Sequence, residues 1–180
     1  MTAGATSSID VTTNTLTISG AGANTTGSLT KIGAGGLTLS GANAYTGATN
    51  VNTGTLTLGA NNVLATASTV VVNGGTFSIA NRTNTVAGVQ LASGSITGTT
   101  GVLTSTTAYD VQSGTVSAIL AGGVGLNKTT SGTATLSGNN TYTGTTTISA
   151  GTLQIGSGST TGSVAGGIVN NAALTVVVPV

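Results

Sequence analysis

Residues 51–58 have the sequence Val51-Asn-Thr-Gly-Thr-Leu-Thr-Leu58, and the pattern of this octapeptide recurs along the whole chain. An apolar residue comes first, Gly and Thr come fourth and fifth, and apolar residues at positions six and eight flank a polar seventh. Close copies begin at Val72 and Ile148. Weaker copies begin at Val11, Ile32, Leu91, Val111, Thr129 and Val169. The nine starts lie 18 to 21 residues apart, and a fixed period of this size is typical of a solenoid.

The second half of each copy alternates polar and apolar residues, which is the period of a half-buried β-strand. We expect positions six and eight, such as Leu56 and Leu58, to point inward, and the seventh, such as Thr57, to point outward. The fourth position is Gly in seven copies, Asn14 in the first and Ala172 in the last. Because Gly and Asn tolerate positive φ, this position is expected to form a corner between strands, and Ala172 departs from that pattern.

One coil of about twenty residues buries too little apolar surface to be stable alone, so neighbouring coils must stack and pair their backbones. We therefore predict an all-β fold, a right-handed parallel β-helix of about nine rungs of roughly 20 residues. At roughly 4.8 Å per rung, its first and last rungs would lie about 38 Å apart. The sequence shows neither the 3.6-residue period nor the capping signals of helices.

Charge is nearly absent from the chain, whose net charge is +1, and the chain has no Cys. We therefore expect no nucleic-acid or acidic-membrane partner, no disulfide framework and no thiolate metal site. The first eight residues lack the basic and apolar regions of a signal peptide, and no stretch has the length of a transmembrane helix. Residues 174–180 stop inside or just after a rung without a polar cap. These features lead us to expect that residues 1–180 are a single β-helix segment of a longer exported chain.

A longer repeat overlies the rungs. Residues 31–60 align without gaps to residues 128–157, at an offset of 97, and fifteen of the thirty positions are identical. The shared part is Leu39-Ser-Gly-x-Asn-x-Tyr-Thr-Gly-x-Thr49, repeated as Leu136-Ser-Gly-x-Asn-x-Tyr-Thr-Gly-x-Thr146. Both copies resemble the passenger-associated transport repeat of bacterial autotransporters. Residues 109–122 resemble the spacer between such repeats.

The resemblance implies a β-helical passenger of a type V secretion system. Such a passenger crosses the outer membrane through its own C-terminal β-barrel, which is absent from this chain, and then folds outside a Gram-negative cell. The role implied is a structural stalk that supports export and surface display, and an adhesin that binds a host-cell or sister-cell surface is the nearest variant. Few charges and no disulfides are compatible with threading an unfolded chain through a pore, and stacked rungs can fold progressively from one end.

Catalytic chemistry has little support in this composition. The chain has no His, Glu, Cys or Trp, so its Ser and Thr hydroxyls lack the usual activating bases. Asp10 and Asp110 are expected roughly 24 Å apart, whereas paired glycosidase carboxylates lie about 5–10 Å apart. Two isolated Asp residues do not form calcium-binding turns. The Gly clusters at 33–36 and 122–125 lack the following helix of a phosphate loop. We expect no enzyme, no catalytic, metal or cofactor-binding residue and no small-molecule substrate.

Tyr45 and Tyr142 occupy equivalent places five rungs apart and are not expected to stack on each other. Each could contact a glycan together with the nearby Asn43 or Asn140. Alternatively, each ring could cover a loop or cap the core beside the Ser-Gly corner, and we favour this structural interpretation because the chain has only four aromatic residues.

Threonines form the most extended surface feature that the pattern predicts. Positions five and seven give the pairs Thr15/Thr17, Thr55/Thr57, Thr76/Ser78, Thr115/Ser117 and Thr133/Thr135. Such an array, interrupted at Gly36, Gln154 and Ala173, resembles the ice-binding face of some β-solenoid antifreeze proteins. Threonine also suits strands without any ligand, because it is β-branched. An ice-binding solenoid and a phage-fibre-like β-helix are therefore the alternative functions.

Overall fold

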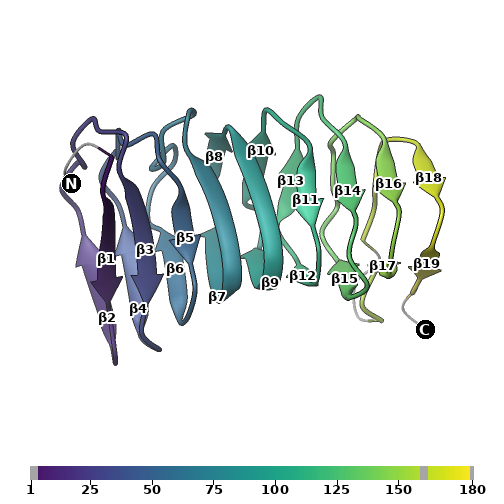
Figure 1. Cartoon of the computed structure of the whole chain (residues 1–180), viewed down its shortest axis with the longest axis horizontal. Helices are drawn as coiled ribbons and strands as arrows, with labels where there is room; N and C mark the ends of the chain where they lie inside the picture. The colour runs from purple at the N-terminus through teal and green to yellow at the C-terminus, as the bar shows by residue number, and fades with distance from the viewer. Residues whose placement is uncertain (1–3, 159–161, 179–180) are drawn as a thin grey trace.

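The chain coils into a parallel β-solenoid (Figure 1). The structure is a computed structural model that describes residues 4–158 and 162–178. Within these residues all the strand pairings are parallel and there is no helix, so none that could cross a membrane. Paired residues in adjoining rungs, such as Leu37 and Leu56, are about 20 positions apart, which confirms the predicted fold. The expectations above for residues 1–8 and 174–180 fall partly outside the described residues, because these exclude residues 1–3 and Pro179-Val180.

The first face of the solenoid carries the strand that opens each rung. Nine described strands stack along it in chain order, so eight turns separate the first from the last. They are β1 (Thr6–Asp10), β3 (Ser28–Ile32), β5 (Thr49–Val51), β7 (Thr69–Ala80), β9 (Gly88–Gly98), β11 (Tyr109–Val111), β14 (Leu126–Lys128), β16 (Thr146–Ile148) and β18 (Ile168–Asn170).

The second face carries the apolar-polar-apolar half of the octapeptide. Its strands are β2 (Thr15–Ile18), β4 (Gly36–Leu39), β6 (Thr55–Leu58), the second halves of β7 and β9, β12 (Gly114–Val116), β15 (Thr133–Leu136), β17 (Thr152–Ile155) and β19 (Ala173–Val176). Strand β19 pairs in register with β17, so the ninth copy forms a rung although Ala172 replaces the corner glycine.

A third face appears only in the middle of the solenoid, and the octapeptide did not predict it. It consists of β8 (Thr83–Val86), β10 (Val102–Ser105) and β13 (Ile119–Ala121). In the rungs on either side, isolated bridges such as Gly22 to Asn43 and Asn139 to Ser163 replace these strands. The transport-like repeats therefore close their rungs with loops on this side.

The core is a stack of aliphatic side chains inside the coil. At position six, Leu37, Leu56, Phe77, Ile96, Val116, Ala134 and Leu153 are all fully buried. The intervening seventh residues, such as Thr38 and Thr57, are half-exposed, which confirms the predicted alternation. The register places Leu56 between Leu37 and Phe77, so this core side chain packs against the equivalent side chains of both neighbouring rungs.

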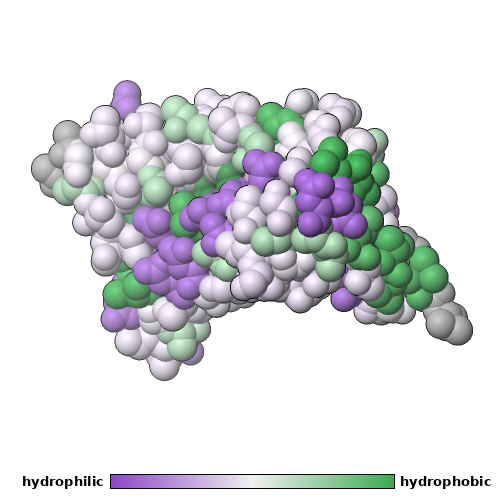
Figure 2. Space-filling model, turned by 45° about the vertical axis from the view of Figure 1, so that its right-hand side comes forward, coloured by the Kyte–Doolittle hydropathy of each residue, from purple (hydrophilic) through white to green (hydrophobic). Residues whose placement is uncertain are grey.

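The end rungs are more exposed than the interior because each has a neighbour on one side only. Leu16 in β2 is 44% exposed, and Ile168, Val169, Val176 and Val178 at the other end are 39–63% exposed. In Figure 2 the C-terminal end accordingly shows a patch of hydrophobic surface.

Corners follow the prediction in five rungs and depart from it in three. Positive φ occurs at the fourth position in Asn14, Gly54, Gly94, Gly114 and Gly151. It does not occur at Gly35, Gly75 or Gly132. Strand β7 continues through its corner with shifts of register beside Asn73, so that the adjacent Gly74 takes the positive φ instead. The corners at Gly35 and Gly132 contain one more residue than the corner at Gly54, and they belong to the rungs that open with Lys31 and Lys128.

The first position of four copies was assigned wrongly. Ile9, not Val11, pairs with Lys31, and Asn170, not Val169, pairs with Ile148. Lys31, not Ile32, pairs with Val51, and Lys128, not Thr129, pairs with Ile148. Both lysines are 0% exposed and point into the core, while Ile32 is half-buried and Thr129 is exposed. A search for an apolar residue passed over lysine, whose aliphatic stem packs in a core while its ammonium reaches a polar site.

Candidate functional site

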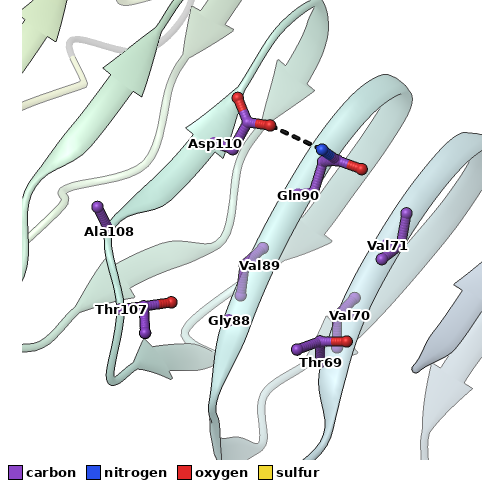
Figure 3. Close-up of a pocket in the computed structure, with 9 residues that line it drawn as sticks. All are labelled: Thr69, Val70, Val71, Gly88, Val89, Gln90, Thr107, Ala108 and Asp110. Atoms are coloured by element: carbon purple, nitrogen blue, oxygen red, sulfur yellow. Dashed lines mark hydrogen bonds between the residues drawn. The ribbon is translucent and has the colours of Figure 1, made fainter. Parts of the chain in front are cut away.

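An open pocket of about 280 Å³ lies on the outer surface of the first face, across β7, β9 and β11 (Figure 3). Its lining residues are Thr69, Val70, Val71, Gly88, Val89, Gln90, Thr107, Ala108 and Asp110. The inward-pointing Val70 and Val89 contribute to its floor, because both are almost fully buried.

The pocket exists because two outward positions carry little or no side chain. Gly88 pairs with Thr69 of the preceding rung, and Ala108 lies one residue before Tyr109 in the following rung. A Cβ atom added to Gly88 would lie 3.1 Å from Oγ1 of Thr107 and 3.5 Å from Cγ2 of Thr69. The missing side chain therefore leaves a notch on the outer surface between Thr69 and Ala108.

The polar wall of the pocket is centred on the carboxylate of Asp110. Nε2 of Gln90 donates to Oδ2 of Asp110 at 2.7 Å, and Nε2 of Gln112 donates to the same oxygen at 2.8 Å. The two amides hold the carboxylate in place. Asp110 also interacts electrostatically with the buried ammonium of Lys128. A carboxylate held in place in this way can accept further hydrogen bonds from the hydroxyl groups of a ligand.

The second carboxylate lies far from this pocket. Asp10 is in β1 and Asp110 is in β11, and five strand-to-strand steps separate them along the first face. At about 4.8 Å per step they are roughly 24 Å apart along the axis, as the sequence predicted. Among the described residues no three His, Cys, Asp or Glu side chains come together as a metal-binding group.

The threonine array on the second face is not one continuous register. Thr55 pairs with Thr76 and Thr76 with Ser95, whose hydroxyl oxygens lie 3.0 Å apart. Further along, Thr115 pairs with Thr135 rather than with Thr133, a shift of two residues from the predicted alignment. The two parallel rows of threonine and serine side chains are thus out of register between β12 and β15, which weighs against a flat ice-binding surface.

Tyr45 and Tyr142 are 0% exposed, so their rings are in the core rather than on a glycan-binding surface. Their hydroxyls each lie 2.7 Å from a buried threonine hydroxyl, that of Thr49 and that of Thr146. Burial raises the pKa of Tyr45 to about 12, although the hydrogen bond to Thr49 acts in the opposite direction. The structural interpretation of the two tyrosines is therefore confirmed.

Asn43 and Asn140 are also almost fully buried. Nδ2 of Asn43 donates to the carbonyl of Gly41 at 2.8 Å, and Nδ2 of Asn140 donates to that of Gly138 at 3.0 Å. The hydrogen bonds of the two asparagines therefore stabilise the Ser-Gly corners, where the chain turns.

Tyr142 also has an aromatic neighbour that the sequence did not predict. Its ring centroid lies 5.8 Å from that of Tyr109 in the preceding rung.

The same local geometry is thus built twice, 97 residues apart: a buried lysine, a buried tyrosine-threonine pair and a buried asparagine. A family model described as the passenger-associated transport repeat matches residues 29–58 and 126–155. The chain contains two passenger-associated transport repeats. Each begins two residues before the start inferred from internal alignment, so that it includes the leucine preceding the buried lysine by two positions. No curated protein and no solved structure matches the chain.

Passenger-associated transport repeats are found in autotransporter passenger domains and suggest secretion through the outer membrane. The two matched segments occupy the same strands of the solenoid at both places: β3 to β6 in the first repeat and β14 to β17 in the second. Each repeat therefore corresponds to one complete rung and the first two strands of the next.

Proposed function

We propose that this chain is a structural stalk of a type V secretion passenger, exported through the outer membrane and displayed at a Gram-negative cell surface. The observation that carries the proposal is the presence of two transport repeats in phase with the rungs of one solenoid. In this role residues 1–180 form one segment of a longer passenger, and the translocating partner is the β-barrel of the same polypeptide.

The physical chemistry of the chain supports this role. It has only five charged residues and no cysteine, so an unfolded chain carries little charge and no cross-link to obstruct its passage through a narrow pore. Each rung pairs only with the rungs before and after it, so stacking can proceed one rung at a time. Burial of apolar side chains in each new rung would then oppose backsliding of the exported segment.

An export experiment tests the proposal. The chain is placed between a signal peptide and an autotransporter β-barrel in a Gram-negative host, and surface protein is measured with added protease. We expect the wild-type chain and Thr57→Asp to reach the surface as protease-resistant rods, and Leu56→Asp to accumulate much less there. Failure of the wild-type chain to appear, under conditions in which the barrel displays its own passenger, would reject the proposal.

A second candidate function is adhesion to a host or sister cell, which the pocket at Asp110 favours. Its orientated carboxylate and neighbouring Gln90 offer acceptors for the hydroxyl groups of a neutral glycan. Purified protein would be applied to immobilised neutral glycans and to whole cells. Adhesion through this pocket predicts that Asp110→Asn weakens binding while Thr30→Asp, an outward position of β3 on the same face but away from the pocket, leaves it unchanged; equal binding by both variants excludes the pocket.

A further inference from the structure

Two of the three cationic side chains in the sequence, Lys31 and Lys128, are completely buried. Each occupies an inward position that holds an aliphatic residue in the adjoining rungs: Val51 pairs with Lys31, and Ile148 with Lys128. Replacing an aliphatic side chain by an ammonium is unfavourable in a core unless the charge is well solvated by polar groups. The two lysines therefore need an explanation beyond filling space.

Backbone carbonyls supply the polar groups. Nζ of Lys31 donates to the carbonyls of Ile32 at 2.8 Å and Gly33 at 2.7 Å, which belong to its own corner. It also donates to the carbonyl of Thr53 at 3.3 Å, which belongs to the corner of the next rung. The ammonium thus joins two successive corners through its three donors.

Lys128 repeats this arrangement 97 residues later. Its Nζ donates to the carbonyl of Thr130 in its own corner and, at 3.2 Å, to the carbonyl of Ala150 in the next corner. Ala150 is equivalent to Thr53, because both lie 22 residues after the lysine. Two separate places in the chain therefore show the same bridge from a lysine to the rung that follows it.

Corner length distinguishes the two lysine rungs from the rungs that follow them. Five residues separate Lys31 from the next core residue, Leu37, whereas four separate Val51 from Leu56. The same difference holds between the rungs opened by Lys128 and Ile148. The additional residue widens the corner, and the lysine ammonium fills the widened space with hydrogen-bond donors.

Glycine in the next corner leaves room for the ammonium. Gly54 has a φ of +65°, and a Cβ atom added there would lie 2.8 Å from Nζ of Lys31. The equivalent residue of the second repeat, Gly151, has a φ of +66°. A Cβ atom added to Gly54 would therefore crowd the lysine nitrogen, and one added to Gly151 would meet the carbonyl of Thr130, to which Lys128 donates.

We propose that Lys31 and Lys128 are latches: within each transport repeat, the lysine locks the corner of its own rung to the corner of the following rung through N–H donors to their carbonyls. Each is a positioning residue: it holds the corner at Thr53 or Ala150 in place, and the latch closes only when that next rung has stacked. Under the proposed stalk function, the latches would secure the solenoid at two points 97 residues apart during export.

The latch can be distinguished from simple core filling by hydrogen exchange of the purified chain. Methionine has a similar length and no donor, so core filling predicts that Lys31→Met leaves the protein unchanged or more stable. The latch predicts faster exchange at the amides of Asn52 and Thr55, which pair with Lys31 and Gly35, by roughly 10- to 100-fold. Lys128→Met should act in the same way at Ser149 and Thr152.

Leu91→Met is the matched control, because Leu91 occupies the same inward position in a rung with a four-residue corner. We expect its exchange pattern to resemble that of the wild type. Unchanged protection at Asn52 and Thr55 in Lys31→Met would overturn the proposal. A uniform loss of protection across all rungs would also overturn it, because the latch acts between two neighbouring corners.

Chemical rescue provides a second readout that depends on N–H donors. Lys31→Ala removes the equivalent of a propylammonium ion, and added propylammonium should restore protection at Asn52 and Thr55. Propyltrimethylammonium has the same charge but no N–H donor and should not restore it. Equal rescue by both ions, or by neither, would contradict the latch. These measurements do not involve secretion, so their failure would leave the stalk function standing, and a failed export experiment would leave the latch standing.

Discussion

Comparing Leu56→Asp with Thr57→Asp directly tests which side chains of the strand point into the core and which point to solvent. Leu56 is 0% exposed and lies between Leu37 and Phe77 in the core stack. Thr57 is half-exposed and points away from that stack. The two substitutions introduce the same carboxyl group one residue apart, so they differ mainly in the side of the strand that receives it.

The expected destabilisation follows from burial. Truncating a buried leucine to alanine costs about 2–5 kcal/mol, and an aspartate at Leu56 adds the cost of an unpaired carboxyl in an apolar site. The sum reaches the lower part of the 5–15 kcal/mol that is typical for the stability of a whole domain. Thr57→Asp loses only strand preference, on a scale that spans about 1 kcal/mol. Leu56→Asp should therefore unfold the surrounding rungs, whereas Thr57→Asp should leave them folded.

Urea titration followed by far-ultraviolet circular dichroism measures both effects. The midpoint for Leu56→Asp should fall sharply or the folded signal should already be lost without urea, while the midpoint for Thr57→Asp should stay close to that of the wild type. Equal shifts of the two midpoints would refute the assignment of position six to the core.

Other expectations concern the tyrosines, the corners and the pH dependence. Tyr45→Phe should lower the free energy of unfolding by about 1–2 kcal/mol in urea titration, because the buried Thr49 hydroxyl loses its partner at 2.7 Å; an unchanged midpoint would show that this bond adds nothing. Gly54→Ala should destabilise by about 1–3 kcal/mol because of its φ of +65° and its contact with Lys31, whereas Gly123→Ala, with no atom within 4 Å of the added Cβ, should be tolerated. Burial raises the pKa of Tyr45 from 10.0 to about 12, so the unfolded chain ionises first and stability should fall as the pH rises from 10 towards 12. Burial lowers the pKa values of Lys31 and Lys128 below 10.5, with partial opposition from Asp10 and Asp110, so these two groups should add stability as the pH rises towards 10.5. The two effects oppose each other up to about pH 10.5, so urea midpoints, with tyrosinate absorbance recorded in parallel, should decline between about pH 10.5 and 12; a midpoint that stays constant over that range would contradict the burial of Tyr45.

The octapeptide was sufficient to predict the rungs and the direction of their side chains, because alternation on a strand directly reflects burial on one face. It predicted Leu56 inside, Thr57 outside and a corner at Gly54, and all three are observed. Tyr45 was interpreted as a structural residue that covers a loop or caps the core, and its full burial agrees with a structural role.

The remaining features depend on contacts between rungs, which one rung's sequence does not encode. The inward position of Lys31 was not predicted, because a charged residue was not considered as a core residue. The recurrence of lysine at the equivalent position 128 could have indicated a structural role. The pairing of Thr115 with Thr135 depends on local corner lengths, and equal spacing of repeats could not predict that shift. The pocket at Gly88 arises from small residues in two neighbouring rungs and has no motif in either one.

The two transport repeats form rungs of one solenoid, and a distance measured between them tests this arrangement most directly. Thr38 and Thr135 are equivalent outward positions in the two repeats, and the chain has no other cysteine to interfere with labels at Thr38→Cys and Thr135→Cys. Five steps separate β4 from β15, so electron spin resonance should give a single narrow distribution centred near 24 Å, broadened by the label tethers. A broad distribution centred near 50–60 Å, as expected for a flexible chain of this length, would contradict the account.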